Sequence, residues 1–124
     1  MTAGLSSAEI GRCAENAVCE HLITHHYEIL CRNYCVPRMG ELDLVARKGD
    51  RLMFVEVKGR VNLGFGGPFA ALTVKKQLRL RRTALHYLQR YDGMNNEIIF
   101  LAAAVWLDDQ GTVRNIQLEP IYFA

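Results

Sequence analysis

Apolar residues recur along this chain at two spacings, and the helical spacing marks two segments. Ser6 followed by Glu9 has the form of a capping box, and small or apolar residues then return every three or four positions. A first helix is therefore predicted over about residues 7–22. The same spacing predicts a second helix over about 73–91. An apolar stripe along this second helix is formed by Val74, Leu78, Leu85 and Leu88.

Alternation of apolar and polar residues predicts the strands. A strand is expected over about 27–34, and two alternating runs around a polar turn predict a hairpin over 41–58. Residues 98–107 are apolar on both faces, which indicates a central strand, and an edge strand is expected over about 112–118. A glycine-rich loop at 64–68 is expected to join the hairpin to the second helix.

The order of these elements predicts an α/β fold with a mixed central sheet of about five strands, flanked by helices on its faces. With 124 residues, the chain is expected to form a single domain over 1–124. Its longest uncharged apolar run, 98–107, is too short to span a bilayer, and the N-terminus lacks the pattern of a signal peptide. We therefore expect no membrane association and a cytoplasmic location.

The chain contains four cysteines, at Cys13, Cys19, Cys31 and Cys35. In a cytoplasmic protein we expect them to be reduced thiols. A zinc site is the alternative, because Cys31 and Cys35 lie near His25 and His26, but this spacing fits no standard ligand pattern.

The predicted hairpin carries charged residues near both ends, where a buried sheet would exclude them. If Gly49 and Asp50 form its two-residue turn, paired residues have numbers that sum to 99, so Asp43 lies opposite Glu56. Two carboxylates whose side chains start about 5 Å apart repel each other unless a cation lies between them. A hard divalent cation such as Mg²⁺ or Mn²⁺ prefers oxygen ligands, so we expect Asp43 and Glu56 to bind one.

Side chains alternate along a strand, so Glu41 and Lys58 are expected on the same face as this carboxylate pair and next to it. Lys58 would then supply a positive charge that orients a water molecule or stabilises negative charge at phosphorus. The alternative is that this face is simply solvated, as in any half-exposed hairpin. The core face would then hold Leu42, Leu44, Val55 and Val57.

The same segment resembles the core motif of the PD-(D/E)XK, or restriction-endonuclease-like, superfamily. The match lies in Gly40-Glu41-Leu42-Asp43-Leu44-Val45, then in Phe54-Val55-Glu56-Val57-Lys58 and Arg60. More narrowly, the chain is similar to the bacterial YraN-type family of uncharacterised predicted endonucleases. This narrower match includes Gly11, Glu15, Ala17, Leu22, Arg32, Asn33 and either Lys75 or Lys76.

This resemblance implies a restriction-endonuclease-like fold and a metal-dependent nuclease activity. By resemblance, Asp43 and Glu56 would be the metal ligands. Lys58 would be the catalytic lysine, and Glu15 an accessory acid delivered from the first helix. Glu41 belongs to the motif of the narrower family and is a further candidate catalytic residue.

The second predicted helix carries basic residues and no acid between Thr73 and Tyr91, although the net charge of the chain is only +2. At 100° per residue, one face collects Lys75, Arg79, Arg82, His86 and Arg90, named the basic stripe below. A stripe of one sign fits contact with a phosphate backbone, whereas a solvated helix face usually alternates signs. The expected nucleic-acid-binding residues are Lys75, Lys76, Arg79, Arg82, Arg90 and, on the hairpin, Arg60.

The sequence thus predicts a metal-dependent nuclease that hydrolyses phosphodiester bonds in nucleic acid, with DNA favoured over RNA. Two alternatives stay open: a non-catalytic nucleic-acid-binding module on the same fold, and a protein-interaction scaffold that needs neither metal nor basic stripe. A homodimer also stays open, because two copies of so small a chain would cover a duplex better than one.

Overall fold

The computed structural model describes residues 4–61, 72–91 and 97–123. Its elements, in chain order, are α1 (Ser7–Thr24), β1 (Glu28–Val36), β2 (Gly40–Lys48), β3 (Arg51–Arg60), α2 (Val74–Tyr91), β4 (Glu97–Leu107) and β5 (Val113–Pro120). The glycine-rich loop expected at 64–68 lies outside the described residues. Every helix and strand expected from the sequence is present, with ends that differ by a few residues.

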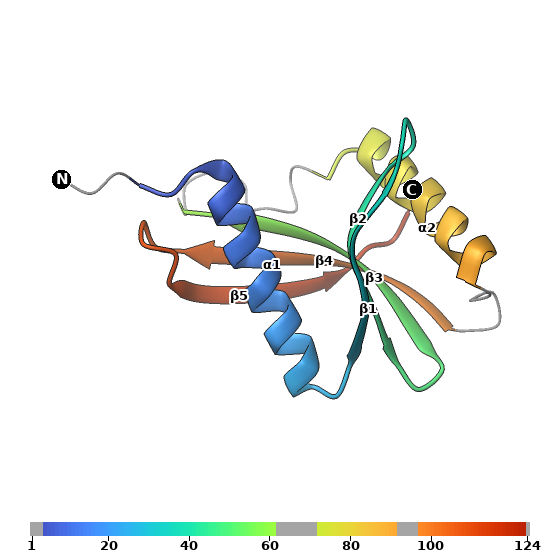
Figure 1. The fold of residues 1–124 in the computed structure, drawn as a ribbon, viewed down its shortest axis with the longest axis horizontal. Coiled ribbons are helices and arrows are strands. Elements are labelled where there is room, and N and C mark those ends of the chain that lie inside the picture. The colour runs from blue at the N-terminus through green and yellow to red at the C-terminus, as the bar shows by residue number, and fades with distance from the viewer. Residues whose placement is uncertain (1–3, 62–71, 92–96, 124) are drawn as a thin grey trace.

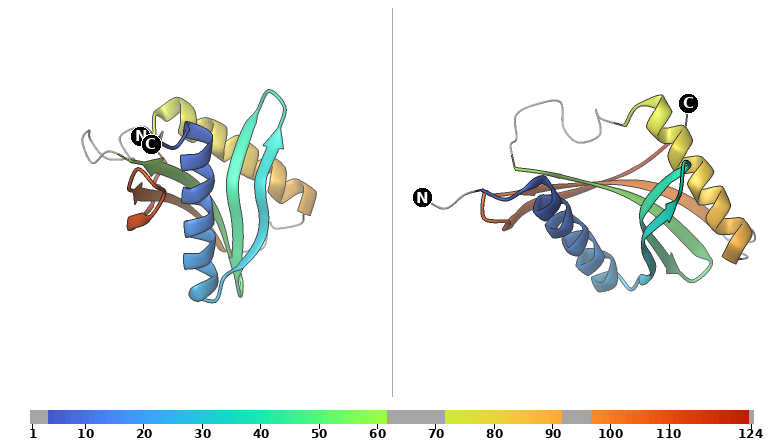
Figure 2. Two further views of the ribbon diagram at one scale, coloured as in Figure 1. Left: turned by 60° about the vertical axis from the view of Figure 1, so that its left-hand side comes forward. Right: turned by 45° about the horizontal axis from the view of Figure 1, so that its top comes forward.

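The five strands form one mixed sheet in the order β1-β2-β3-β4-β5. Neighbouring strands are antiparallel except β3 and β4, which are parallel. The two helices lie on opposite faces of the sheet, as the views in Figures 1 and 2 show. The expected α/β fold with a mixed five-stranded sheet is confirmed, and it is consistent with a restriction-endonuclease-like fold. No helix in the described ranges is both long and apolar enough to cross a membrane.

Local sequence signals account for where most elements begin and end. The Ser6 hydroxyl accepts the backbone N–H of Glu9, and the Glu9 carboxylate accepts that of Ser6, so the expected capping box starts α1. At α2, the Thr73 hydroxyl accepts the N–H of Lys76 at 3.2 Å. The β2–β3 hairpin turns at Gly49, whose φ of +58° suits a glycine. Its register runs from Leu44 opposite Val55 to Lys48 opposite Arg51, as the two-residue turn predicts.

Each helix covers its own layer of buried side chains. The α1-side core contains Ala14, Val18, Leu22, Leu44, Ala46, Met53, Val55, Val57, Ala103 and Val105, among others. The α2-side core contains Leu42, Val45, Leu52, Phe54, Leu80, Ala84, Tyr87 and Leu88. Leu101 to Val105 of β4 are buried without interruption, which confirms the expected central strand.

Two glycines allow the helices to approach the sheet closely. A Cβ on Gly59 of β3 would lie 2.9 Å from the Cβ of Ala14 in α1. A Cβ on Gly40, whose φ is +154°, would lie 2.7 Å from the Oγ1 of Thr83 in α2. Larger residues at these positions would push the helices away from the strands that carry the candidate site.

Most of the apolar stripe predicted for α2 does not pack on the sheet. Val74, Leu78 and Leu85 keep 61%, 48% and 46% of their surface exposed. The buried face is a second apolar stripe at helical spacing, made of Leu80, Thr83, Ala84, Tyr87 and Leu88. Both stripes satisfy a helical period, and the shape of the sheet selects between them.

The expected shared core face of the hairpin is also wrong in part. Leu44 packs in the α1-side core, but Leu42 packs in the α2-side core, so strict alternation along β2 breaks at Asp43. The β1–β2 register places Asn33 opposite Asp43, and Asn33 has a φ of +54°. This left-handed residue interrupts the extended backbone at the point where the faces exchange.

Candidate functional site

The candidate site lies where β2 separates from β3. The hydrogen-bonded register of these strands ends at Leu44 opposite Val55, and beyond it the β1–β2 hairpin turns away from β3 (Figure 1). There the Asp43 Oδ2 accepts the backbone N–H of Val57 at 2.7 Å. The side chain of Asp43 thus accepts a hydrogen bond from the backbone of β3, which holds it next to Glu56.

Asp43 and Glu56 form a half-buried carboxyl pair, although the strand pairing expected to place them opposite each other ends one residue earlier, at Leu44 and Val55. Burial raises the pKa of Asp43 to about 6, and the hydrogen bond from the Val57 N–H opposes this by lowering the pKa. Burial and then the Asp43 charge raise the pKa of Glu56 to about 8. A side-chain hydrogen bond between the two carboxyl groups lowers the pKa of Asp43 and raises that of Glu56. The pair therefore holds a proton near neutral pH when no cation is present.

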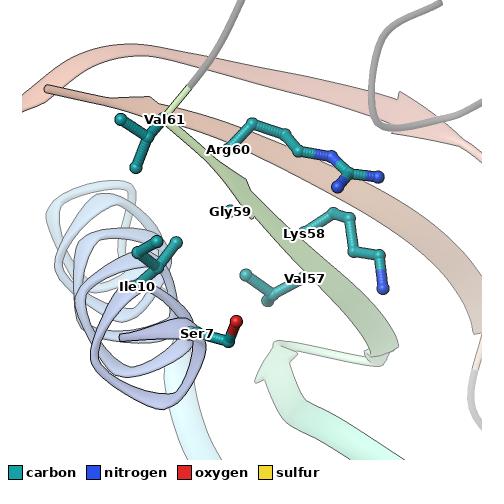
Figure 3. A pocket seen from close by; sticks show the side chains of 8 residues that line it. Ser7, Ile10, Val57, Lys58, Gly59, Arg60 and Val61 are labelled. Atoms are coloured by element: carbon teal, nitrogen blue, oxygen red, sulfur yellow. The ribbon is translucent and has the colours of Figure 1, made fainter. Parts of the chain in front are cut away.

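Two lysines and two further acids surround this pair. The charges of Lys58 on β3 and of Lys76 on α2 lower the pKa of Glu56. Figure 3 shows the Lys58 and Arg60 side chains extending from β3 on the side away from α1. The charges of Glu15 and Glu41 raise the pKa of Asp43. Both faces of the sheet thus contribute to the electric field at one carboxyl pair.

Glu15 is held at the site by β1. Its carboxylate lies 3.8 Å from the Arg32 guanidinium, which also donates a 2.8 Å hydrogen bond to the Asn16 side chain. The Glu15 side chain is only 18% exposed. The ion pair compensates part of the cost of placing a third carboxylate close to Asp43.

The donor set fits a hard divalent cation with few protein ligands. Across residues 4–61, 72–91 and 97–123, no three or more His, Cys, Asp or Glu side chains gather as a metal-binding group. Mg²⁺ commonly uses one or two protein carboxylates and fills its other positions with water and substrate phosphate oxygens. Two carboxyl groups that repel each other are therefore a chemically sufficient anchor for Mg²⁺ or Mn²⁺. The four cysteines are free thiols, and none belongs to such a group.

The basic stripe is exposed along α2, apart from one member. Lys75, Arg79, Arg82 and Arg90 face solvent, and Arg90 lies over the ring of Tyr91, 5.6 Å from its centre. His86 is half-buried, and its Nδ1 shares a 2.6 Å hydrogen bond with the Tyr34 hydroxyl. Lys76 is also exposed, on the side of α2 from which it acts on Glu56.

A hollow of about 530 Å³ lies between the start of α1 and the end of β3 (Figure 3). Ser7, Ile10 and Gly11 line it from α1, and Val57 to Arg60 line it from β3, together with Val61 directly after the strand. Neither Asp43 nor Glu56 belongs to this lining. The carboxyl pair is thus adjacent to the hollow through β3 but does not open into it.

Reasoning from the sequence did not find two contributors to the site. The ion pair of Arg32 with Glu15 joins β1 to α1, and only the fold brings these residues together. Thr83 is fully buried above Gly40, where its hydroxyl donates to the carbonyl of Arg79 at 2.7 Å. Its one sequence signal is a polar residue within an otherwise apolar helical stripe.

We predict that the metal-free protein loses stability as pH rises from about 4.5 to about 8. Because the pKa values of Asp43 and Glu56 are raised in the folded state, this state binds more protons than the unfolded one in that window. The loss should amount to several kcal/mol, since each pH unit by which a pKa is raised corresponds to about 1.4 kcal/mol. It can be measured by urea denaturation in EDTA at several pH values. Glu56→Gln should flatten the curve, whereas Glu119→Gln, at an exposed position on β5, should leave it unchanged.

Comparison with known proteins identifies the family. Residues 14–100 match the uncharacterised protein family UPF0102. A UPF0102 protein of Dictyoglomus turgidum is 38% identical over 96% of this chain and 100% of its own length. One of Caldicellulosiruptor saccharolyticus is 36% identical over 92% of this chain and 96% of its own. The chain therefore belongs to the UPF0102 family, which confirms the resemblance to the YraN-type family.

Proposed function

We propose that this protein is a metal-dependent nuclease that hydrolyses phosphodiester bonds in DNA. The observation that carries the proposal is the half-buried Asp43–Glu56 carboxyl pair, whose pKa values are raised to about 6 and about 8. Nothing in the hydrophobic core requires two adjacent carboxyl groups there. Groups with strongly perturbed pKa values beside a charge partner are concentrated at functional sites.

The residues around the pair have separable tasks. A divalent cation bound to Asp43 and Glu56 would polarise the scissile phosphate and lower the pKa of an attacking water. The Val57 N–H holds the Asp43 carboxylate in one orientation. Lys58, whose charge acts on Glu56, stabilises the negative charge that develops on the phosphate oxygens. Arg32 keeps Glu15 close to Asp43 as an accessory acid.

The decisive test is a cleavage screen with Mg²⁺ and with Mn²⁺. The substrates should include linear, flapped and four-way DNA as well as structured RNA, because the residues do not define the shape of the substrate. We expect cleavage of at least one DNA substrate that stops when EDTA is added. Cleavage that persists in EDTA, or in an Asp43→Asn variant, would contradict the proposed site.

A non-catalytic nucleic-acid-binding module is the second candidate. One observation favours it: the exposed arginines and lysine of the basic stripe on α2 would contact a phosphate backbone without requiring a metal ion. Binding of nucleic acid without cleavage of any substrate in the screen would select this candidate. If the wild-type protein neither binds nor cleaves any substrate in the screen, the remaining candidate is a protein-interaction scaffold.

The basic stripe should bind the nucleic-acid backbone, so replacing Arg82 and Arg90 by alanine should weaken binding about equally for all sequences. Each lost phosphate contact should make the slope of log K against log salt less steep by about 0.9 for a duplex. Fluorescence anisotropy in EDTA from 50 to 200 mM salt measures both effects. Arg12→Ala in α1 removes an exposed arginine from the opposite face and should leave the slope unchanged. A double variant with the same slope as wild-type protein would show that the basic stripe is only a solvated helix face.

A further inference from the structure

A pocket of about 400 Å³ lies between the β1–β2 turn and α2, at the end of the hairpin that carries Asp43. It is lined by the β1–β2 turn with Pro37 and Arg38, by Gly40 and Glu41 at the start of β2, and by Arg79 of α2. Its charged side chains are two arginines, Arg38 and Arg79, and one acid, Glu41. Of these, Arg38 was not among the candidates from the sequence.

The β1–β2 turn holds Arg38 in a conformation that favours glycine. The Met39 N–H donates to the Val36 carbonyl at 3.0 Å, with Pro37 and Arg38 as the two central residues. Arg38 has a φ of +64°. Proline followed by a residue of positive φ is the pattern of a type II turn, whose second central position is usually glycine. An arginine at this strained position indicates a use for its side chain rather than for its backbone.

Arg79 reaches the pocket because α2 packs directly on the end of β2. A Cβ on Gly40 would lie 3.6 Å from the Cβ of Arg79 and 2.7 Å from the hydroxyl of Thr83. This close contact fixes the base of the Arg79 side chain beside the β1–β2 turn. Over residues 4–61, 72–91 and 97–123, neither Arg38 nor Arg79 forms an ion pair, whereas Arg32, Arg47, Arg51 and Arg114 each do.

Glu41 connects this pocket to the carboxyl pair. It lines the pocket beside the arginines, and its charge also raises the pKa of Asp43. An anion bound by Arg38 and Arg79 would therefore lie next to the candidate metal ligands. Arg79 also belongs to the basic stripe, so the pocket joins the stripe to the candidate site.

We propose that this pocket is a phosphate subsite, in which Arg38 and Arg79 bind a backbone phosphate of the nucleic-acid strand beside the one to be cleaved. The inference rests on the proposed function and extends it by assigning a binding role to the β1–β2 turn. Two guanidinium groups provide several N–H donors in the fork geometry that matches phosphate oxygens. A pocket of about 400 Å³ has room for a phosphodiester group.

The first experiment measures binding of a single-stranded and a duplex oligonucleotide in EDTA, so that no cleavage occurs. Arg38→Ala and Arg79→Ala should each weaken binding about three- to tenfold and make the salt slope less steep by about 0.7 to 0.9. Arg12→Ala is the matched control, because it removes an exposed arginine from α1, on the opposite face of the sheet, and should change neither value. Inorganic phosphate at millimolar concentration should displace the oligonucleotide less effectively from the Arg38→Ala variant than from wild-type protein.

The second experiment separates a binding role of Arg38 from a structural one. Arg38→Gly should keep or raise the melting temperature, because glycine adopts the positive φ without strain, and should still weaken binding. Glu41→Gln should strengthen metal-free binding, because it removes the one acid from the pocket lining. Nucleic-acid binding that is unchanged in both arginine variants would overturn the subsite and leave the proposed function standing. Absence of binding by the wild-type protein would overturn both.

Discussion

Replacing Lys58 with alanine should reduce the cleavage rate about a hundredfold or more while changing substrate affinity by well under tenfold. The Lys58 ammonium acts on the carboxyl pair, and its side chain extends from β3 away from α1. Charge on the phosphate oxygens develops mainly in the transition state, so the loss should fall on the rate constant of the chemical step. One partly exposed phosphate contact contributes only about 1 kcal/mol to binding.

The measurement is a single-turnover cleavage assay paired with binding in EDTA. Lys48→Ala is a suitable control, since Lys48 is an exposed lysine at the far end of the β2–β3 hairpin, over the ring of Tyr27. It changes the net charge equally and should leave the rate unchanged. A Lys58→Ala variant that loses binding and rate in the same proportion would make Lys58 a substrate-binding residue rather than a catalytic one.

Glu56→Gln should abolish cleavage and the stabilisation by divalent metal together, because it removes one of only two candidate ligands. A cation that binds only the folded state at ten times its dissociation constant stabilises it by about 1.4 kcal/mol. For a domain of this size, that corresponds to about 4–6 °C in melting temperature. Asp43→Asn should lose most of the same gain. The melting temperature with millimolar Mn²⁺ and with EDTA gives both values.

The same variants should behave in the opposite way without metal. At pH 8, Glu56→Gln should be at least as stable as wild-type protein, because it removes a buried charge that repels Asp43. A residue that served only the fold would instead destabilise the protein under both conditions. An equal response to Mn²⁺ in wild-type and variant protein would rule out this pair as the metal site.

The prediction of the hairpin from the sequence succeeded because every signal for it is local. Gly49 adopts the positive φ of a two-residue turn, and this turn sets the register from Lys48 opposite Arg51 to Leu44 opposite Val55. Extended by one residue, this register predicts that Asp43 lies next to Glu56, although the pairing itself ends at Leu44 and Val55. Residue order thus predicted which carboxyl groups meet, as it predicted the capping box of α1 and the basic stripe of α2. The hydrogen bond from the Val57 N–H that holds Asp43, however, is seen only in the fold.

The parts that differ depend on contacts between segments distant in sequence. The helix α2 has two apolar stripes of the same period, and only the sheet surface, with Gly40 beneath Thr83, selects the one that contains Leu80 and Tyr87. Likewise, the exchange of faces at Asp43 lies beside Asn33 of the neighbouring strand, whose φ is positive.

The sequence by itself thus determined the elements, the hairpin register and the charged residues brought together by that register, because turn chemistry and side-chain period act over a few residues. The tertiary structure alone decided which faces are buried, how Arg32 reaches Glu15, and that Arg38 and Arg79 share a pocket. These features depend on how helices and strands pack against one another, and packing is decided by the shapes of whole surfaces rather than by neighbouring residues.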